Sequence, residues 1–307
     1  MDRLEAMSML VAVTERGSLS AAGRALQVPL ATLSRKISDL EALLGTRLLI
    51  RTTRKLTLTD AGIAYVAAAR RILEEVEEVE REAAGEFTAP KGELVVTAPN
   101  MFGRLHVLPV VADFLATFPE ISIRLLLADR NVDLIGDHVD MAVRIGKLHD
   151  SSMVATQIGV MRTVTCASPT LLAGRGKPRT PNDLIRLPCV AVDTPMPSPS
   201  WRFRNPRSGA VMDVSIQPRL TVTTAEVAAQ AAVCRVGVVR LLHYQAAEAV
   251  KRGELQIFFE EYEPEPAPVH LVHVTRRQMP LKMRRFLDFA TPRLKEVLRG
   301  ISSTESK

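Results

Sequence analysis

The chain has 307 residues, of which 47% are hydrophobic and 24% are charged, and its formal net charge is +6 at pH 7. This length exceeds one ordinary hydrophobic core and indicates at least two domains, and the composition excludes an intrinsically disordered chain. The positive charge favours a polyanionic partner, although net charge alone also reflects solubility.

The N-terminal residues and the cysteines indicate a cytoplasmic protein. Asp2 and Glu5 interrupt the start of the chain, so it does not resemble a signal peptide, and no apolar run reaches the roughly 18 residues that a membrane span needs. The three cysteines share no ligand-like spacing, which predicts reduced, buried thiols: Cys166, Cys189 and Cys234.

Three short helical patterns follow one another in the first 44 residues. Apolar side chains recur at helical spacing over residues 4–15, and Gly17 then breaks the chain. The Ser18 hydroxyl is a natural N-cap for a second helix that ends at Leu26. Pro29 suits the first position of a third helix, over residues 30–44, because the donor that proline lacks would be unpaired there anyway.

The third helix has an apolar back and a polar front. One stripe is expected to be buried and contains Leu30, Leu33, Ile37, Leu40 and Leu44. The other side contains Ala31, Thr32, Arg35, Ser38 and Asp39, flanked by Ser34 and Lys36. Such a front can enter the major groove of DNA, because short hydroxyl groups can contact base edges while cations contact phosphates.

A basic hairpin is predicted after the third helix. Residues 48–50 and 56–58 read as two short strands, and residues 51–55 form a basic tip between them, which is typical of the wing of a winged helix-turn-helix domain. Residues 24–55 contain seven cationic and two acidic side chains, so the basic character of the chain is concentrated here. The alternative is a small helical interaction module with a solvated charged face.

Four motifs in this segment resemble the DNA-binding domain of the LysR-type transcriptional regulators. They are residues 17–22 (GSLSAA), 33–49 (LSRKISDLEALLGTRLL), 51–54 (RTTR) and 58–62 (LTDAG). The resemblance implies a DNA-binding domain over residues 1–60. The candidate DNA-binding residues are Ser18, Thr32, Ser34, Arg35, Lys36, Ser38, Arg51, Arg54 and Lys55.

The sequence departs from the family pattern at the start of the third helix. Many members have serine at the position of Pro29 and proline at that of Leu30. No side-chain N-cap therefore precedes this helix, and base recognition is predicted to depend on Thr32, Ser34 and Arg35 rather than on the first residues.

A long helical pattern with a coiled-coil seam follows the hairpin, and residues 61–90 are expected to form a linker helix. Apolar residues step by four and three along it: Tyr65, Ala69, Ile72, Val76, Val79 and Ala83. Glutamates between them would be repelled by DNA. The helix either packs on its own domain or, as the family resemblance implies, forms a dimer, which suits a reader of an interrupted palindrome in double-stranded DNA. Pro90 marks the domain boundary.

The remaining residues alternate between strands and helices, which indicates an α/β architecture. Strands are expected at residues 94–98, 121–127, 140–145 and 163–167, with helices through residue 118 and from residue 133 onward. Further strands are expected at 189–192, 201–203, 220–222, 236–239 and 270–275, with helices at 224–234 and 281–298.

This order, with residues 140–144 (DMAVR), 166–169 (CASP) and 237–239 (GVV), resembles the effector domain of the LysR family. The resemblance implies a two-lobed, periplasmic-binding-protein-like domain over residues 91–300. Lobe 1 would contain residues 91–167 and 270–299, and lobe 2 would contain residues 168–269.

In such folds a small-molecule effector binds between the lobes, at strand ends and helix N-termini. The candidate effector-binding residues are Asn100, Phe102, Arg144, Gly146, Thr223, Thr224 and Arg202. Each also has a plain structural interpretation: Arg144 can pair with a nearby acid, and Thr223 can cap its helix. A carboxylate or aromatic metabolite is what the family resemblance implies.

No pattern in the sequence indicates an enzyme, a metal site or a cofactor. His270 and His273 are an odd number of residues apart, so on one strand they face opposite sides and cannot share a metal. Motifs of nucleophilic serines, phosphate loops and paired cysteines are lacking.

Three hypotheses remain. The leading one is a dimeric or tetrameric regulator that senses a small molecule. The second is an architectural DNA-binding protein with a ligand-independent oligomerisation domain, and the third is an enzyme or solute-binding protein with an appended helical module.

Overall fold

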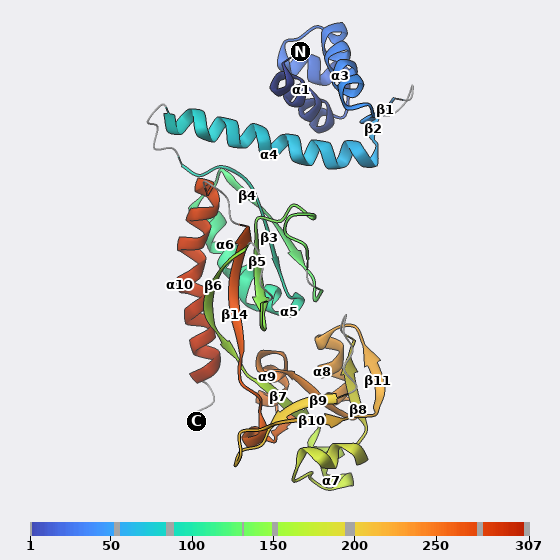
Figure 1. Cartoon of the computed structure of the whole chain (residues 1–307), viewed down its shortest axis with the longest axis vertical. Helices are drawn as coiled ribbons and strands as arrows, with labels where there is room; N and C mark the ends of the chain where they lie inside the picture. Colours follow the sequence, from blue (N-terminus) through green and yellow to red (C-terminus); the bar gives the residue numbers. More distant parts are fainter. Residues whose placement is uncertain are drawn as a thin grey trace. The chain divides into compact units, whose positions relative to one another are not determined.

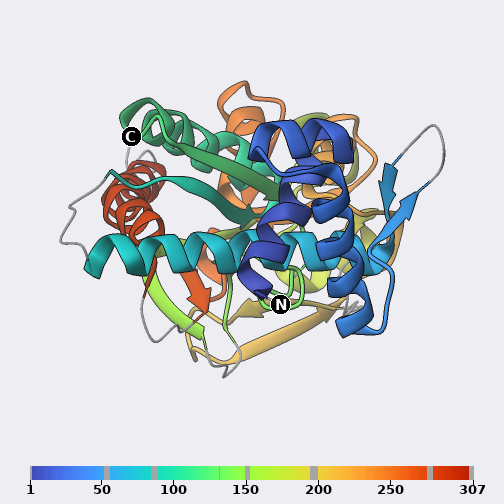
Figure 2. The ribbon, with the colours of Figure 1, turned by 90° about the horizontal axis from the view of Figure 1, so that it is seen from above.

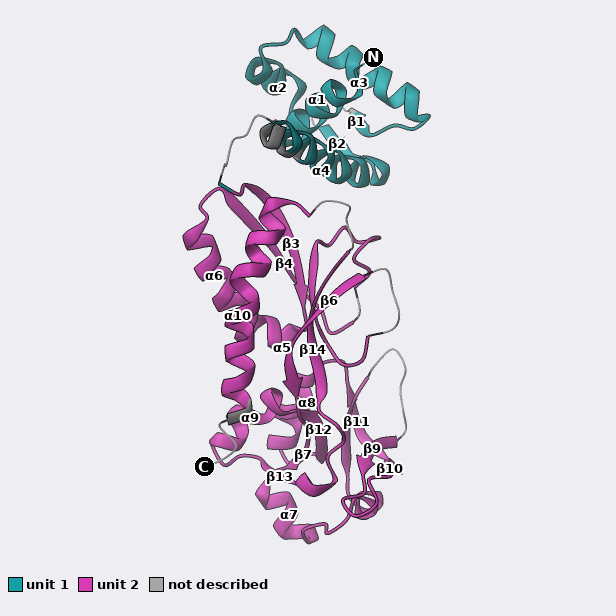
Figure 3. Ribbon diagram, turned by 60° about the vertical axis from the view of Figure 1, so that its left-hand side comes forward, with its two compact units in different colours: residues 1–89 teal, residues 90–307 magenta. Residues whose placement is uncertain are grey.

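The computed structural model describes residues 2–51, 56–83, 89–130, 132–148, 153–193, 200–274 and 279–303. The chain divides into two compact units, residues 1–89 and residues 90–307, shown in different colours in Figure 3.

The first unit is a group of helices with a two-stranded wing. It contains α1 (Arg3–Arg16), α2 (Leu19–Leu26), α3 (Leu30–Leu44), β1 (Leu49–Arg51), β2 (Leu56–Leu58) and α4 (Asp60–Ala83). β1 and β2 are antiparallel and stand out from the helices in Figure 2. Side chains of α1, α2, α3, α4 and β1 form one core, whose centre contains Leu10, Leu33, Ile37 and Leu40.

The α3 stripe is buried at its middle and exposed at its ends. Leu33, Ile37 and Leu40 are fully buried, whereas Leu30 and Leu44 are 48% and 40% exposed. The expectation of a continuous buried stripe is therefore wrong at both ends, because α3 is longer than the core it covers. Pro29 is the N-cap residue and not the first helical residue, and no side chain caps α3, as predicted.

Lobe 1 of the second unit is built on a five-stranded sheet with the order β4-β3-β5-β14-β6. Its strands are β3 (Gly92–Ala98), β4 (Ile121–Leu127), β5 (Met141–Ile145), β6 (Met153–Met161) and β14 (Ala267–Val274). β3 is parallel to β4 and β5, and β14 is antiparallel to β5 and β6.

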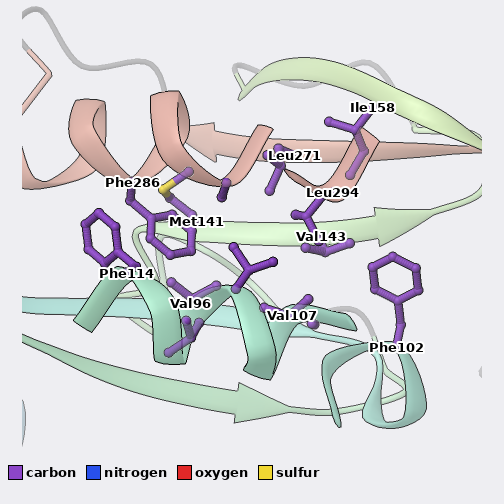
Figure 4. Packing of buried hydrophobic residues seen from close by; sticks show 14 of the residues in the cluster. Val96, Phe102, Val107, Phe114, Met141, Val143, Ile158, Leu271, Phe286 and Leu294 are labelled. Atoms are coloured by element: carbon purple, nitrogen blue, oxygen red, sulfur yellow. The ribbon is translucent and has the colours of Figure 1, made fainter. Parts of the chain in front are cut away.

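Helices cover one face of the lobe 1 sheet. They are α5 (Asn100–Phe102), η1 (Gly103–Val107), α6 (Leu108–Thr117) and α10 (Leu281–Ser303). Figure 4 shows their core, in which Phe114 and Phe286 pack against Val96 and Met141. α6 and α10 lie on the same side of the sheet in Figure 1. Because β3 is parallel to β4 and β5, the carboxyl ends of these three strands, and the segments that follow them, lie at the same edge of the sheet.

Lobe 2 has a second five-stranded sheet with the order β11-β8-β12-β7-β13. Its strands are β7 (Thr163–Ala167), β8 (Cys189–Val192), β11 (Pro218–Val222), β12 (Val238–Leu242) and β13 (Gln256–Phe258). One face packs on α8 (Ala225–Val233) and α9 (His243–Lys251). The other face packs on α7 (Pro169–Arg175), η2 (Pro181–Arg186) and a ribbon of β9 (Ser200–Arg204) and β10 (Val211–Ser215). η3 (Glu260–Tyr262) leads back to lobe 1.

Three expectations from the sequence are wrong. Residues 134–138 form turns and not a helix: Ile135 donates its N–H to the Asp133 carboxylate, and His138 has a positive φ of 55°. β7 belongs to lobe 2 and not to lobe 1, because it pairs with β12 and β13, so the chain crosses at residue 162. The strand expected at 236–239 is β12, which begins two residues later.

The cysteines are free, and two of the three are buried as predicted. Burial raises the pKa of the Cys166 thiol to about 12 and that of Cys189 to about 11, so both are protonated at neutral pH. Cys234 is exposed at the end of α8, so the expectation of burial is wrong there.

Candidate DNA-binding surface and effector pocket

The exposed side of α3 carries the side chains expected to contact DNA. Arg35 and Ser38 are exposed, and Thr32 and Ser34 are half-buried beside the core stripe. The turn that leads into α3 packs closely against α2, because a Cβ at Gly23 would lie 2.9 Å from the Val28 carbonyl oxygen. A helix packed tightly on one side and polar on the other is suited to insertion into a groove.

Lys36 and Ser18, two of the predicted DNA-binding residues, take part in contacts that stabilise the first unit. Lys36 pairs with Glu5 of α1, so its ammonium group ties α3 to α1. The Ser18 hydroxyl accepts from the Ala21 N–H at 3.1 Å and is the N-cap of α2, as predicted. The hydrogen of the Ser18 hydroxyl stays available as a donor.

The wing is fixed at its base by a side chain of α3. The Glu41 carboxylate accepts from the N–H groups of Leu48 and Leu49 at 2.8 and 3.0 Å. The two predicted strands are present, and Leu49 pairs with Leu58 and Arg51 with Leu56. The first strand begins one residue later than predicted, so Arg51 belongs to β1 and not to the tip. The Arg51 side chain, Arg54 and Lys55 lie outside the described residues.

A small pocket lies at the carboxyl ends of β3, β4 and β5 in lobe 1. Its volume is about 100 Å³, and its polar lining consists of Thr97, Asp129, Arg130 and Arg144. Arg144 donates to the Val132 carbonyl oxygen, and burial lowers the pKa of its guanidinium group while Asp133 opposes that shift. Two cationic groups and one carboxylate therefore face a space that holds only a few waters.

The predicted effector residues of lobe 1 have different positions. Only Arg144 lines the pocket. Asn100 binds Asp129 twice, through its backbone N–H at 2.9 Å and its side-chain amide at 3.0 Å. Phe102 is fully buried in the lobe 1 core, and Gly146 follows β5 with a φ of 114°.

The predicted effector residues of lobe 2 also have separate positions. The Thr224 side chain caps α8 by accepting from Val227, and Thr223 is exposed beside it. Arg202 is exposed on β9 and pairs at 3.2 Å with Asp213 of β10. The helix cap that the sequence assigned to Thr223 is therefore formed by Thr224 instead.

Sequence reasoning missed Asp129 and Arg130. Both follow β4, whose bounds were predicted without error, and parallel strands bring their carboxyl ends to one edge of a sheet. The residues after the second strand were therefore identifiable by the rule that selected Asn100 and Arg144.

The two lobes meet through side chains of α5, η1, α8 and α9. Tyr244 of α9 packs edge-on against Phe102 and lies 5.8 Å from the His106 ring, measured between ring centroids. Arg104 of η1 pairs with Glu226 of α8 at 3.0 Å. These contacts join a helical segment that starts beside the pocket to the second lobe.

Comparison with known proteins identifies the family. The model of bacterial regulatory helix-turn-helix proteins of the lysR family matches residues 4–63, and the model of the LysR substrate binding domain matches residues 88–295. The chain belongs to the LysR family of transcriptional regulators. It joins a helix-turn-helix domain that binds DNA to a domain that binds an effector, which confirms the resemblance inferred from residues 17–62.

Full-length members of the LysR family are similar along almost the whole chain. A transcriptional repressor of Pseudomonas aeruginosa is 32% identical over 298 residues, covering 94% of this chain and 91% of the relative. The structure of CrgA from Neisseria meningitidis is 29% identical, with a TM-score of 0.60 over 96% of this chain and 99% of CrgA. LysG of Corynebacterium glutamicum, solved with a bound arginine effector, is 22% identical with a TM-score of 0.56, covering 96% of this chain and 99% of LysG, and shares the fold.

The described part of the chain shows no helix that is both long and apolar enough to cross a membrane. Across the same residues, no three His, Cys, Asp or Glu side chains are grouped so that they could hold a metal ion.

Proposed function

We propose that this LysR-family regulator reads double-stranded DNA with the exposed side of α3. The observation that carries the proposal is the division of α3 into a fully buried row, Leu33, Ile37 and Leu40, and an exposed Arg35. A cation on the exposed side of a rigidly packed helix can bind phosphates or the O6 and N7 atoms of guanine.

The other candidate residues have supporting roles in the proposal. Ser34, Thr32 and Ser38 contact bases or the backbone beside Arg35. Ser18 donates its hydroxyl hydrogen to a phosphate, and Lys36 contributes mainly by fixing α3 on α1. Arg51, Arg54 and Lys55 are proposed as phosphate contacts on the strength of their charge and their place in the wing sequence.

The lobe 1 pocket is proposed as one half of the effector site. Its volume is well below the roughly 300 Å³ at which typical ligand sites begin, so lobe 2 must supply the rest. Arg130 and Arg144 favour a ligand with a carboxylate, and Asp129 offers an acceptor for a donor group of the same molecule. Thr223 and Gly146 remain candidates at the borders of this site.

We propose a homodimer or homotetramer whose contacts include α4. Ile63, Ile72 and Val79 of this helix are exposed, at 57%, 39% and 59%. Two copies joined by α4 would place two α3 helices on an interrupted palindrome. A regulator of this kind acts in the cytoplasm, where the DNA is, and it carries out no catalysis.

Replacement of Arg35 tests the DNA-binding face. DNA that the full-length protein selects from a randomised library is footprinted with wild type and with Arg35→Ala. Arg35 is exposed, so the variant should fold normally while its footprint on the selected site is lost. Arg16→Ala at the end of α1 is the matched control. A wild-type footprint from Arg35→Ala would mean that the recognition face is wrong.

Thermal unfolding of the full-length protein with a panel of carboxylate and aromatic metabolites distinguishes a sensor from an architectural DNA-binding protein. A sensor gains roughly 2.7 kcal/mol of stability at a ligand concentration 100 times its Kd. An architectural protein gains none with any compound.

A further inference from the structure

One large apolar side chain stands next to the proposed reading face of α3. Leu30 is the first residue of the helix and is 48% exposed, whereas Leu33, Ile37 and Leu40 in the middle of the helix are fully buried. Leu43 and Leu44 are exposed at the other end of the helix. Exposed leucines have a hydration cost that a binding partner removes. Leu30 is thus available for an apolar contact.

The backbone holds Leu30 in this position. Gln27 ends α2 in the left-handed region with a φ of 56°, and the Val28 N–H returns to the Gly23 carbonyl oxygen at 2.9 Å. Pro29 then fixes the next φ at −56°, and its own carbonyl oxygen accepts from the Leu33 N–H at 3.1 Å. These two hydrogen bonds fix the turn to α2 on one side and to α3 on the other. A rotation of α3 that buried Leu30 would break them.

Helical spacing sets Leu30 beside the side chains proposed to read bases. Leu30 and Ser34 are four residues apart and lie on one edge of α3, one turn from each other. Ala31 and Arg35 form the neighbouring row in the same way, and Ala31 is exposed too. Helical side chains lean toward the N-terminus, so Leu30 reaches beyond the first turn, in the direction in which a recognition helix enters its groove.

The major groove presents one apolar group that such a side chain can contact. The donors and acceptors of the base edges suit serine and arginine, whereas the 5-methyl group of thymine suits a leucine. We propose that Leu30 contacts the 5-methyl group of a thymine in each half-site and so determines the preference for that base. This inference rests on the proposed insertion of α3 into the major groove.

Replacement of thymine by deoxyuridine tests the contact, because it removes the methyl group and leaves base pairing unchanged. The duplex that wild type selects from a randomised library is resynthesised with deoxyuridine at each thymine in turn, and affinity is measured at one fixed salt concentration. The transfer of one methyl group from water corresponds to roughly a four-fold change in affinity. Wild type should lose about four-fold at one thymine of each half-site.

The Leu30→Ala variant completes the test. It should bind the thymine duplex more weakly than wild type and should bind the thymine and deoxyuridine duplexes equally well. Leu44→Ala, at the other exposed end of the same helix, should discriminate the two duplexes as wild type does. Thermal unfolding checks that both variants are about as stable as wild type, as expected when an exposed leucine is replaced by alanine.

Two results would overturn the inference. One is a wild type that tolerates deoxyuridine at every thymine, and the other is Leu30→Ala that still discriminates at the sensitive position. The second would show that another side chain contacts that methyl group. If Arg35→Ala also selects the same DNA with unchanged affinity, the assignment of α3 as the recognition helix is wrong. That result would contradict the proposed function as well as the role of Leu30.

Discussion

His106 lies where the two lobes of the effector domain meet, between the rings of Phe102 and Tyr244. Its Nε2 atom is buried and has no hydrogen-bond partner among the described residues, and burial lowers the pKa of the ring below its ordinary value of about 6.5. The imidazole ring of His106 is therefore uncharged in the folded protein at neutral pH. In the unfolded chain the same ring takes up a proton at a higher pH than in the folded state.

This difference predicts an acid-sensitive stability. The stability associated with a neutral His106 is complete above about pH 6.5 and is lost as the pH falls through the lower folded-state pKa. Between about pH 7.5 and about pH 5, wild type should lose more unfolding free energy than His106→Gln, measured by Trp201 fluorescence in urea. His138→Asn in the 134–138 turn is the control. Equal losses in wild type and His106→Gln would contradict the prediction.

Single residues also show where sequence reasoning reaches its limit. The partner of Lys36 is Glu5, 31 residues away on another helix, and no local pattern reveals such a pair. The burial of Phe102 is equally hidden, because its neighbour Tyr244 comes from the other lobe. Asp129 was within reach, since it follows a strand whose ends the sequence predicted.

At the scale of elements, α4 is the helix for which we propose a contact between copies of this chain. Its apolar seam was predicted from a spacing of four and three, and Val79 and Ile72 of that seam are exposed in the single chain. Exposed apolar residues in a regular row indicate a contact that one chain does not provide.

A charge placed in the seam should separate the subunits. Val79→Asp is expected to lower the sedimentation mass of the full-length protein from a dimer or tetramer to a smaller species, because the carboxylate would lose hydration in the contact. Val211→Asp makes the same change at an equally exposed valine of β10. Val79→Asp with a wild-type mass would exclude this part of α4 from the interface.

Elements with strong periodicity were predictable, and irregular ones were not. The bounds of α3 and β4 match the sequence prediction, because both have regular apolar spacing and clear breaks at their ends. The edge strand β6 was missed because its buried residues do not alternate. β7 was placed in the wrong lobe, since the pairing with β12 depends on residues more than 70 positions away.

At the scale of the whole effector domain, a partly buried ion pair joins the two chain crossings between the lobes. Arg162, between β6 and β7, binds the Glu263 carboxylate with two hydrogen bonds of 2.8 and 2.7 Å, and Glu263 lies on the return path to β14. The side chains are only 24% and 12% exposed. A pair shielded from water in this way resists separation more than a surface pair does.

Glu263→Gln should therefore weaken the domain. Without the Glu263 charge, Arg162 keeps the more exposed carboxylate of Glu260 at 3.1 Å, so its charge is less well compensated. We expect a decrease of about 1–2 kcal/mol in the free energy of unfolding, followed by Trp201 fluorescence in urea. Glu265→Gln removes an exposed pair with Arg204 and should cost no more than about 0.5 kcal/mol. Equal stability of the two variants would show that Arg162 does not hold the crossings together.

At the scale of the whole chain, we propose that a ligand in the effector domain changes how this regulator binds its DNA. The most direct measurement is a footprint of the full-length protein on its selected site, with and without a compound that stabilises it. The compound should change the protected pattern for wild type and leave it unchanged for Arg144→Gln, because that variant lacks the pocket guanidinium group. A compound that stabilises wild type through Arg144 and leaves the wild-type footprint unchanged would contradict the claim.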